Sequence, residues 1–130
     1  MDLYREAILD HWKHPKHFGL LEVPDISVRS INPQCGDEMT IQLKVKDGRV
    51  TDFGFQGESC AISRAAASLM SEQVIGKTFA EIKAMTEADH LGRLGAPLNP
   101  SRQKCGLLSL ETLKRAILQY ESSRNTPEHD

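Results

Sequence analysis

The amino-acid sequence predicts an α+β fold, in which a three-stranded antiparallel sheet carries helices on one face. Short stretches in the first half of the chain alternate apolar and polar residues, as half-buried strands do. The pair Asp47-Gly48 joins two of these stretches, and this dipeptide favours a tight hairpin turn. The second half changes to a helical period, and strands followed by helices are typical of the α+β class.

Three stretches have the character of strands. Residues 26–31 alternate apolar with mostly polar side chains, and residues 39–46 do so more clearly. The third stretch, residues 50–55, follows the Asp-Gly turn. The hairpin predicts that the second and third strands are neighbours, so the three form a meander.

The first two helices are predicted from composition and from their ends. Residues 2–13 form one amphipathic segment, which Pro15 terminates. An alanine-rich stretch then begins at Cys60 and stops at Gly76, as expected for a helix that ends on a glycine.

Two more helices complete the prediction. Thr78 and Glu81 have the spacing of a capping box, so we expect a short helix over residues 78–89. Residues 91–104 contain two glycines and two prolines and are predicted to be a loop. The last helix is expected from about Gly106 to Ser122.

Length and composition favour one domain over residues 1–130, with an N-terminal arm over about residues 1–20 and a flexible tail over about 123–130. A hydrophobic fraction of 39% is enough for a core, and no apolar run is long enough to span a membrane. The net charge of -2 comes from interleaved acids and bases, so we expect no nucleic-acid partner. The amphipathic start does not resemble a secretory signal, which predicts a cytoplasmic protein.

The three cysteines are an odd number and all lie at predicted element boundaries. Cys35 and Asp37 flank a glycine in the turn between the first two strands, Cys60 begins the alanine-rich helix, and Cys105 begins the last helix. A helix N-terminus stabilises an anion, so the thiols of Cys60 and Cys105 should ionise below the usual pKa of about 8.5.

Three thiolates and one carboxylate would complete a tetrahedral ligand set for zinc or iron. Gly36 can adopt the positive φ that a tight turn around an ion needs. Two alternatives remain open from the residues alone: the cysteines could be small core residues, and Asp37 an ordinary turn residue. Lys104 is either a surface lysine or a cation beside the site, and the histidines of the first 17 residues favour structural or surface roles over a second metal site.

Four motifs resemble the IscU/NifU-type family of iron–sulfur cluster scaffolds, and together they cover nearly the whole chain. These motifs are YREAILDHWKHPKHFG (4–19), NPQCGDEMTIQLKV (32–45), FGFQGESCAISRAAASLM (53–70) and KCGLLSLETLKRAI (104–117). The resemblance implies a SufE/NifU-like fold in which Cys35, Asp37, Cys60 and Cys105 bind a [2Fe-2S] cluster.

The same resemblance implies a set of partners. A cysteine desulfurase would deliver persulfide sulfur to Cys35 or Cys105, and an electron donor such as a ferredoxin would supply electrons. Iron completes the cluster, which then passes to recipient apo-proteins. A homodimer is left open.

One departure from the family pattern points to an alternative. Lys104 stands where IscU-type scaffolds usually have a histidine, and this resembles the SufU branch, whose members hold zinc at the same site and accept persulfide sulfur as sulfurtransferases. SufU proteins usually have an insertion between the second and third cysteines, and the 45-residue spacing from Cys60 to Cys105 leaves no room for it. A carrier scaffold, a zinc-dependent sulfurtransferase and a zinc-stabilised structural domain are therefore three distinct hypotheses.

Overall fold

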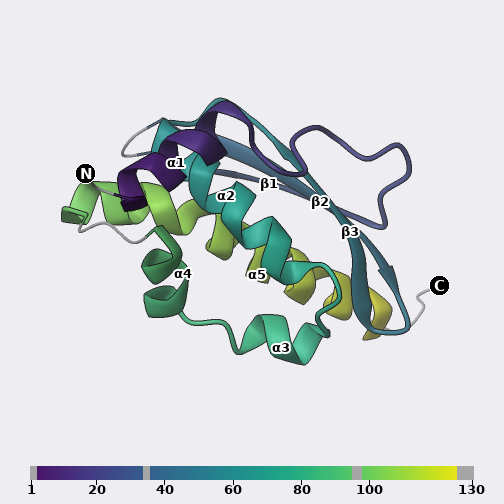
Figure 1. Ribbon diagram of the computed structural model, residues 1–130. Helices are drawn as coiled ribbons and strands as arrows, with labels where there is room; N and C mark the ends of the chain where they lie inside the picture. Colours follow the sequence, from purple (N-terminus) through teal and green to yellow (C-terminus); the bar gives the residue numbers. More distant parts are fainter. Residues whose placement is uncertain (1–2, 34–35, 95–97, 126–130) are drawn as a thin grey trace.

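The computed structural model describes residues 3–33, 36–94 and 98–125. Its three strands form one antiparallel sheet in the order β1-β2-β3, and the helices gather on one side of it (Figure 1). The predicted fold class is confirmed. The strands are β1 (Ile26–Ile31), β2 (Glu38–Lys46) and β3 (Arg49–Gln56), and the helices are α1 (Leu3–Lys13), α2 (Ala61–Val74), α3 (Phe79–Lys83), α4 (Glu87–Leu94) and α5 (Pro100–Asn125).

The sheet follows the predicted alternation. Side chains of β1 are buried and exposed in strict alternation, because one sheet face meets the helices and the other does not. Ile41 of β2 pairs with Val28 on one side and with Phe55 on the other, which places all three in the core. The hairpin turn has positive φ at Asp47 (55°) and Gly48 (76°), as a two-residue turn of this kind requires.

The helices form a layer on the sheet. α5 packs on β1 and β2, α2 packs beside it towards β3, and α1 lies on α2 (Figure 1). α5 is the longest helix, at 26 residues, and within the described ranges no helix is both long and apolar enough to cross a membrane. The main hydrophobic cluster lies between the sheet and these helices, and its members include Leu43, Phe53, Met70, Leu110 and Ile117.

The expected single helix over residues 78–89 is wrong, because two short helices, α3 and α4, occupy this region. The capping box is present: the Thr78 side chain accepts from the Glu81 N–H, and the Glu81 side chain accepts from the Thr78 N–H. A second cap divides the segment, since Oγ1 of Thr86 accepts from the N–H of Asp89 at 3.1 Å and starts α4.

The predicted loop over residues 91–104 and the predicted start of the last helix are also wrong. α4 continues to Leu94, and α5 already begins at Pro100. Oδ1 of Asn99 accepts from the N–H of Arg102 at 2.8 Å and caps the helix. A proline is tolerated at the first helical position because its missing N–H would have no partner there. Cys105 therefore lies more than a turn inside α5, where the effect of the helix N-terminus has largely decayed, so the ionisation argument for this thiol fails.

The segment after α1 protects an edge of the sheet. The N–H of Gly19 donates to the carbonyl of Phe55 at 2.7 Å, and the N–H of Phe55 donates to the carbonyl of His17 at 3.2 Å. These bonds satisfy the outer edge of β3, which would otherwise be open to pairing with another chain. The chain then crosses the outer face, where Leu21 N–H donates to Oε1 of Gln42 at 2.9 Å.

Candidate metal centre

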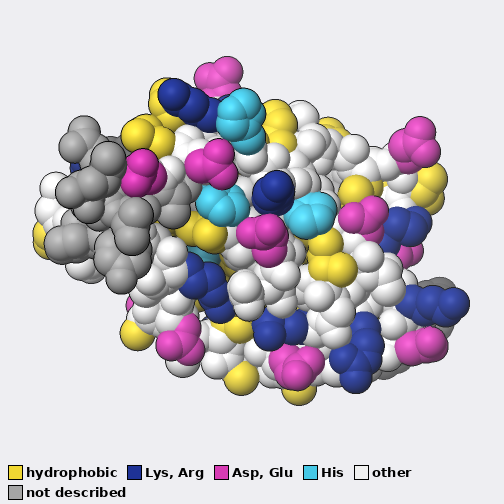
Figure 2. Space-filling view, in the orientation of Figure 1, with side chains coloured by type: hydrophobic (Ala, Val, Ile, Leu, Met, Phe, Trp, Pro, Cys, Tyr) yellow, Lys and Arg dark blue, Asp and Glu magenta, His cyan; other side chains and the backbone are white. Residues whose placement is uncertain are grey.

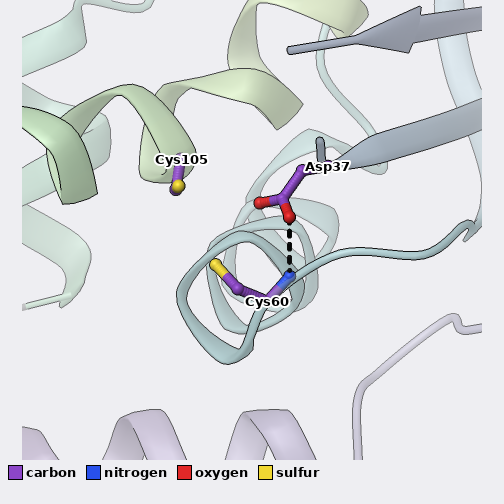
Figure 3. A group of neighbouring side chains, drawn as sticks. All are labelled: Asp37, Cys60 and Cys105. Carbon is purple, nitrogen blue, oxygen red and sulfur yellow. Dashed lines mark hydrogen bonds between the residues drawn. The ribbon is translucent and has the colours of Figure 1, made fainter. Parts of the chain in front are cut away.

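Three of the four predicted ligands meet at one end of the sheet. The carboxylate of Asp37 and the sulfurs of Cys60 and Cys105 all lie within 4.8 Å of one another. They come from the turn before β2, the start of α2 and the second turn of α5, and they face a common point in Figure 3. The fourth predicted ligand, Cys35, lies outside the described residues.

The three donors fit a metal ion by their chemistry. Bonds from zinc to thiolate or carboxylate are about 2.0 to 2.3 Å long, so two donors of a tetrahedral ion lie about 3.3 to 3.8 Å apart. The three donor atoms lie within 4.8 Å of one another, so the widest pair would have to close by up to about 1 Å around an ion. Thiolate and carboxylate donors suit zinc and iron.

Asp37 is held from both oxygens. Oδ1 accepts from the backbone N–H of Cys60 at 3.2 Å, and Oδ2 accepts from the hydroxyl of Ser63 at 2.7 Å. The turn that positions it closes through Gly36, whose φ is 76° and whose N–H donates to the carbonyl of Asn32 at 2.8 Å. Asp37 is only 7% exposed, which argues against the alternative that it is an ordinary turn residue at the surface.

The two described cysteines differ in access to solvent. Cys60 is exposed and occupies the N-cap position of α2, where its side chain makes no capping hydrogen bond. Its sulfur lies 3.6 Å from the hydroxyl of Ser63. Cys105 is buried, with 7% of its surface exposed, so of these two cysteines only Cys60 is open to solvent.

Ser63 is a site residue that the sequence analysis missed. It is fully buried, and its hydroxyl contacts Asp37, Cys60 and the carbonyl oxygen of Cys105, the last at 2.8 Å. A signal was available, because Ser63 shares the buried face of α2 with Ala66 and Met70. A hydroxyl on such a face needs a polar partner, and the position one turn from Cys60 indicates where that partner lies.

His90 is a second residue that the sequence analysis missed, and its ring makes hydrogen-bond contacts with α5. Its Nε2 lies 2.8 Å from the carbonyl oxygen of Gly106 and 3.0 Å from the hydroxyl of Ser109. Because a carbonyl oxygen only accepts, Nε2 carries the proton, and Nδ1 accepts from Arg93 over 3.4 Å. Burial, reinforced by the charge of Arg93 and opposed by the bond to Gly106, lowers the pKa of His90 to about 4. The ring is therefore neutral at pH 7.

Two hollows flank the ligands. One, of about 550 Å³, is open to solvent and is lined by Asp37, Cys60 and Arg64 together with the glycines before them. The guanidinium of Arg64 lies 4.3 Å from the ring centroid of Phe18, so the segment after α1 contacts one of the side chains that line this hollow. The other, of about 400 Å³, lies between the end of β1 and α5, and the exposed Lys104 lines it.

The N-terminal histidines join α1 and its following segment to α2. Nδ1 of His11 lies 2.7 Å from the hydroxyl of Ser68, and Nδ1 of His17 lies 2.8 Å from the hydroxyl of Ser71. Histidine side chains gather over α1 and α2 in Figure 2. These contacts support the structural interpretation of His11 and His17.

Comparison with known proteins shows the family of this chain. The family model described as NifU-like N terminal domain matches residues 3–127. The chain is 38% identical to the iron–sulfur cluster assembly scaffold protein IscU of Thermotoga maritima, covering 88% of this chain and 92% of that protein. It is 34% identical to the zinc-dependent sulfurtransferase SufU of Bacillus subtilis, covering 92% of each. The crystal structure of a nitrogen-fixing NifU-like protein (N-terminal) from Brucella abortus has a TM-score of 0.74 at 26% identity, covering 92% of this chain and 94% of that one.

Proposed function

The chain belongs to the family of NifU-like N-terminal domains, and on this premise we propose that it is a scaffold that assembles an iron–sulfur cluster and passes it on. The observation that carries the proposal is the meeting of Asp37, Cys60 and Cys105 within 4.8 Å. Cys35 would complete the set, because it stands two residues before Asp37 at the same turn. The cargo would be a [2Fe-2S] cluster with four protein ligands.

The donor set suits a cargo that must leave again. Thiolates bind iron strongly, whereas a carboxylate is a harder and weaker ligand in such a site. Asp37 is already satisfied by Cys60 N–H and Ser63, so it can leave the metal without becoming an unpaired buried charge. Cys60 faces solvent at the open hollow, which gives a recipient protein direct access.

Sulfur would arrive from a cysteine desulfurase as a persulfide. The accepting thiolate attacks the outer sulfur of the donor persulfide, gains that sulfur, and releases the donor's thiolate. Of the two predicted acceptors, Cys35 and Cys105, burial disfavours Cys105. We therefore assign the persulfide to Cys35. A ferredoxin-type electron donor and recipient apo-proteins are the further partners, in a reducing cytoplasm where thiols stay free.

Anaerobic reconstitution tests the scaffold function. The chain is incubated with desulfurase, cysteine, ferrous iron and a reductant, and the expected result is the visible absorption of a [2Fe-2S] cluster with acid-labile sulfide. A Cys60→Ala variant serves as the matched control and should hold much less cluster. The proposal fails if no cluster forms while the desulfurase turns over normally.

A zinc-dependent sulfurtransferase is the second candidate, favoured by Lys104 directly before Cys105. In that case the chain purified without oxygen would contain one zinc per chain and no labile sulfide. It would also stimulate the desulfurase many-fold and carry persulfide on Cys35. Metal and sulfide content of the anaerobically purified protein therefore separates the two functions.

A further inference from the structure

Ser63 is the one side chain among the described residues whose polar atom contacts all three described ligand residues. Its hydroxyl lies 2.7 Å from Oδ2 of Asp37, 2.8 Å from the carbonyl oxygen of Cys105 and 3.6 Å from the sulfur of Cys60. These three residues come from the turn before β2, the N-cap of α2 and the second turn of α5. Ser63 is fully buried, so solvent water does not compete for these contacts.

The hydroxyl cannot satisfy all its neighbours equally, since it has one hydrogen and two lone pairs. Its hydrogen can go to the Asp37 carboxylate or to the Cys105 carbonyl, and the bond to a charged acceptor is the stronger. As a neutral thiol, Cys60 donates to the hydroxyl oxygen. The bonds from the Ser63 hydroxyl and the Cys60 N–H hold both oxygens of the Asp37 carboxylate, and each oxygen keeps a lone pair for a metal.

We propose that Ser63 is a positioning residue for metal binding, which acts by orienting Asp37 towards the ion. This inference rests on the proposed metal site. Hydrogen-bond partners that orient metal ligands commonly change metal affinity about 10- to 100-fold when they are removed. A serine that merely fills space in α2 would leave metal affinity unchanged.

Ser71 provides a matched control on the same helix. It is also fully buried, and its hydroxyl donates to the carbonyl of Ser68 at 2.6 Å. Its other contacts are with His17 and the Lys16 carbonyl, and in the described part of the chain its hydroxyl bonds to none of Asp37, Cys60 and Cys105. Removing this hydroxyl should therefore cost stability without a direct effect on the site.

Zinc affinity, measured by competition with a chromogenic chelator, tests the proposal. Ser63→Ala should bind zinc about 10- to 100-fold more weakly than wild type, while Ser71→Ala should match wild type. In an Asp37→Ala background, Ser63→Ala should add no further loss, because its effect passes through that carboxylate. Wild-type affinity in Ser63→Ala, or an equal loss in both backgrounds, overturns the proposal.

A second pair of variants covers the case in which Ser63→Ala does not fold. Ser63→Thr and Ser63→Val have nearly the same shape and differ by the hydroxyl. The threonine variant should bind zinc more tightly than the valine variant and keep the charge-transfer spectrum of the cobalt-loaded wild type; equal affinities overturn the proposal. If the wild type binds neither zinc nor cobalt, the proposed metal site itself fails. If the wild type binds metal and the Ser63 variants bind it equally well, only the role of Ser63 is overturned.

Discussion

The backbone N–H of Cys60 donates to Oδ1 of Asp37 over 3.2 Å, which joins two proposed ligand residues that are 23 positions apart in the sequence. The contact depends on a close crossing of the chain just before Cys60. There the carbonyl of Glu58 accepts from the N–H of Glu38 at 2.9 Å, so the segment runs against the start of β2. Gly57 makes this approach possible, because a Cβ there would lie only 2.3 Å from the carbonyl oxygen of Glu38.

Gly57→Ala should therefore lower both stability and zinc affinity. Its φ of 148° strains any other residue, and the added methyl group would push the Cys60 segment off β2. We expect a loss of more than about 1 kcal/mol in the free energy of unfolding, measured by chemical denaturation. Gly92→Ala is the control: it lies in α4 with nothing within 4 Å of its added Cβ and should stabilise by up to about 1 kcal/mol. An unchanged free energy of unfolding in Gly57→Ala would contradict the close approach of the Gly57 backbone to Glu38.

Acid should destabilise the protein through His90. Above pH 6.5 the ring is neutral in both the folded and the unfolded state. Between pH 6.5 and about 4 the unfolded chain binds a proton that the buried ring in the folded protein does not, so unfolding becomes more favourable as the pH falls. The full loss in the free energy of unfolding is about 3 kcal/mol, since each pKa unit between the folded and unfolded values corresponds to about 1.36 kcal/mol.

The measurement is the free energy of unfolding of zinc-free protein between pH 7 and pH 4, for wild type and for His90→Gln. The variant lacks this titration, so its stability should fall less over the same range. Parallel profiles for the two proteins would show that His90 titrates normally in the folded state.

Asn99→Ala should loosen the helix turn that carries Cys105. The side chain caps α5 through the N–H of Arg102, and losing such a cap costs about 0.5 to 2 kcal/mol. Hydrogen exchange should speed up over the first turns of α5 and stay unchanged in α2. Asn99→Ser retains a capping oxygen and should behave as wild type. Equal exchange rates in wild type and Asn99→Ala would rule out this cap.

Removing metal with a chelator should leave the protein folded. The main hydrophobic cluster between the sheet, α2 and α5 contains none of Asp37, Cys60 and Cys105. We therefore expect the core to stay packed when no metal is bound. Far-UV circular dichroism and a cooperative thermal transition should both persist after chelation. Loss of helix on chelation would instead favour the zinc-stabilised structural domain.

The strands and the longest helices could be predicted because their signals are local. Alternation over residues 39–46, the Asp47-Gly48 turn and the helix stop at Gly76 each depend on a few neighbouring residues. The sequence predicts too late a start for the last helix, because Pro100 resembles a loop residue. A proline in the first turn and one in a loop look alike in sequence, and the Asn99 cap decides between them.

The ligand residues could be identified in part for the same reason. Asp37 and Cys60 lie at element ends, where unusual residue types stand out. The sequence predicts a helix N-terminal environment for Cys105, which lies instead in the second turn of α5. His90 gives no local signal, and Ser63 gives only its place on the buried face of α2, since their roles come from contacts with α5 that span 16 and 42 residues of sequence.

The separation of ligands from core also bears on how this scaffold could change over evolutionary time or in the laboratory. Exchanging Asp37 for cysteine or histidine would alter the donor chemistry while the sheet and its helices keep their packing partners. A graded series of such variants would compare metal preferences on one constant protein frame. Because the donor residues lie outside the two hydrophobic clusters, substitutions among them can change how tightly a metal is held while the packing of the fold stays the same.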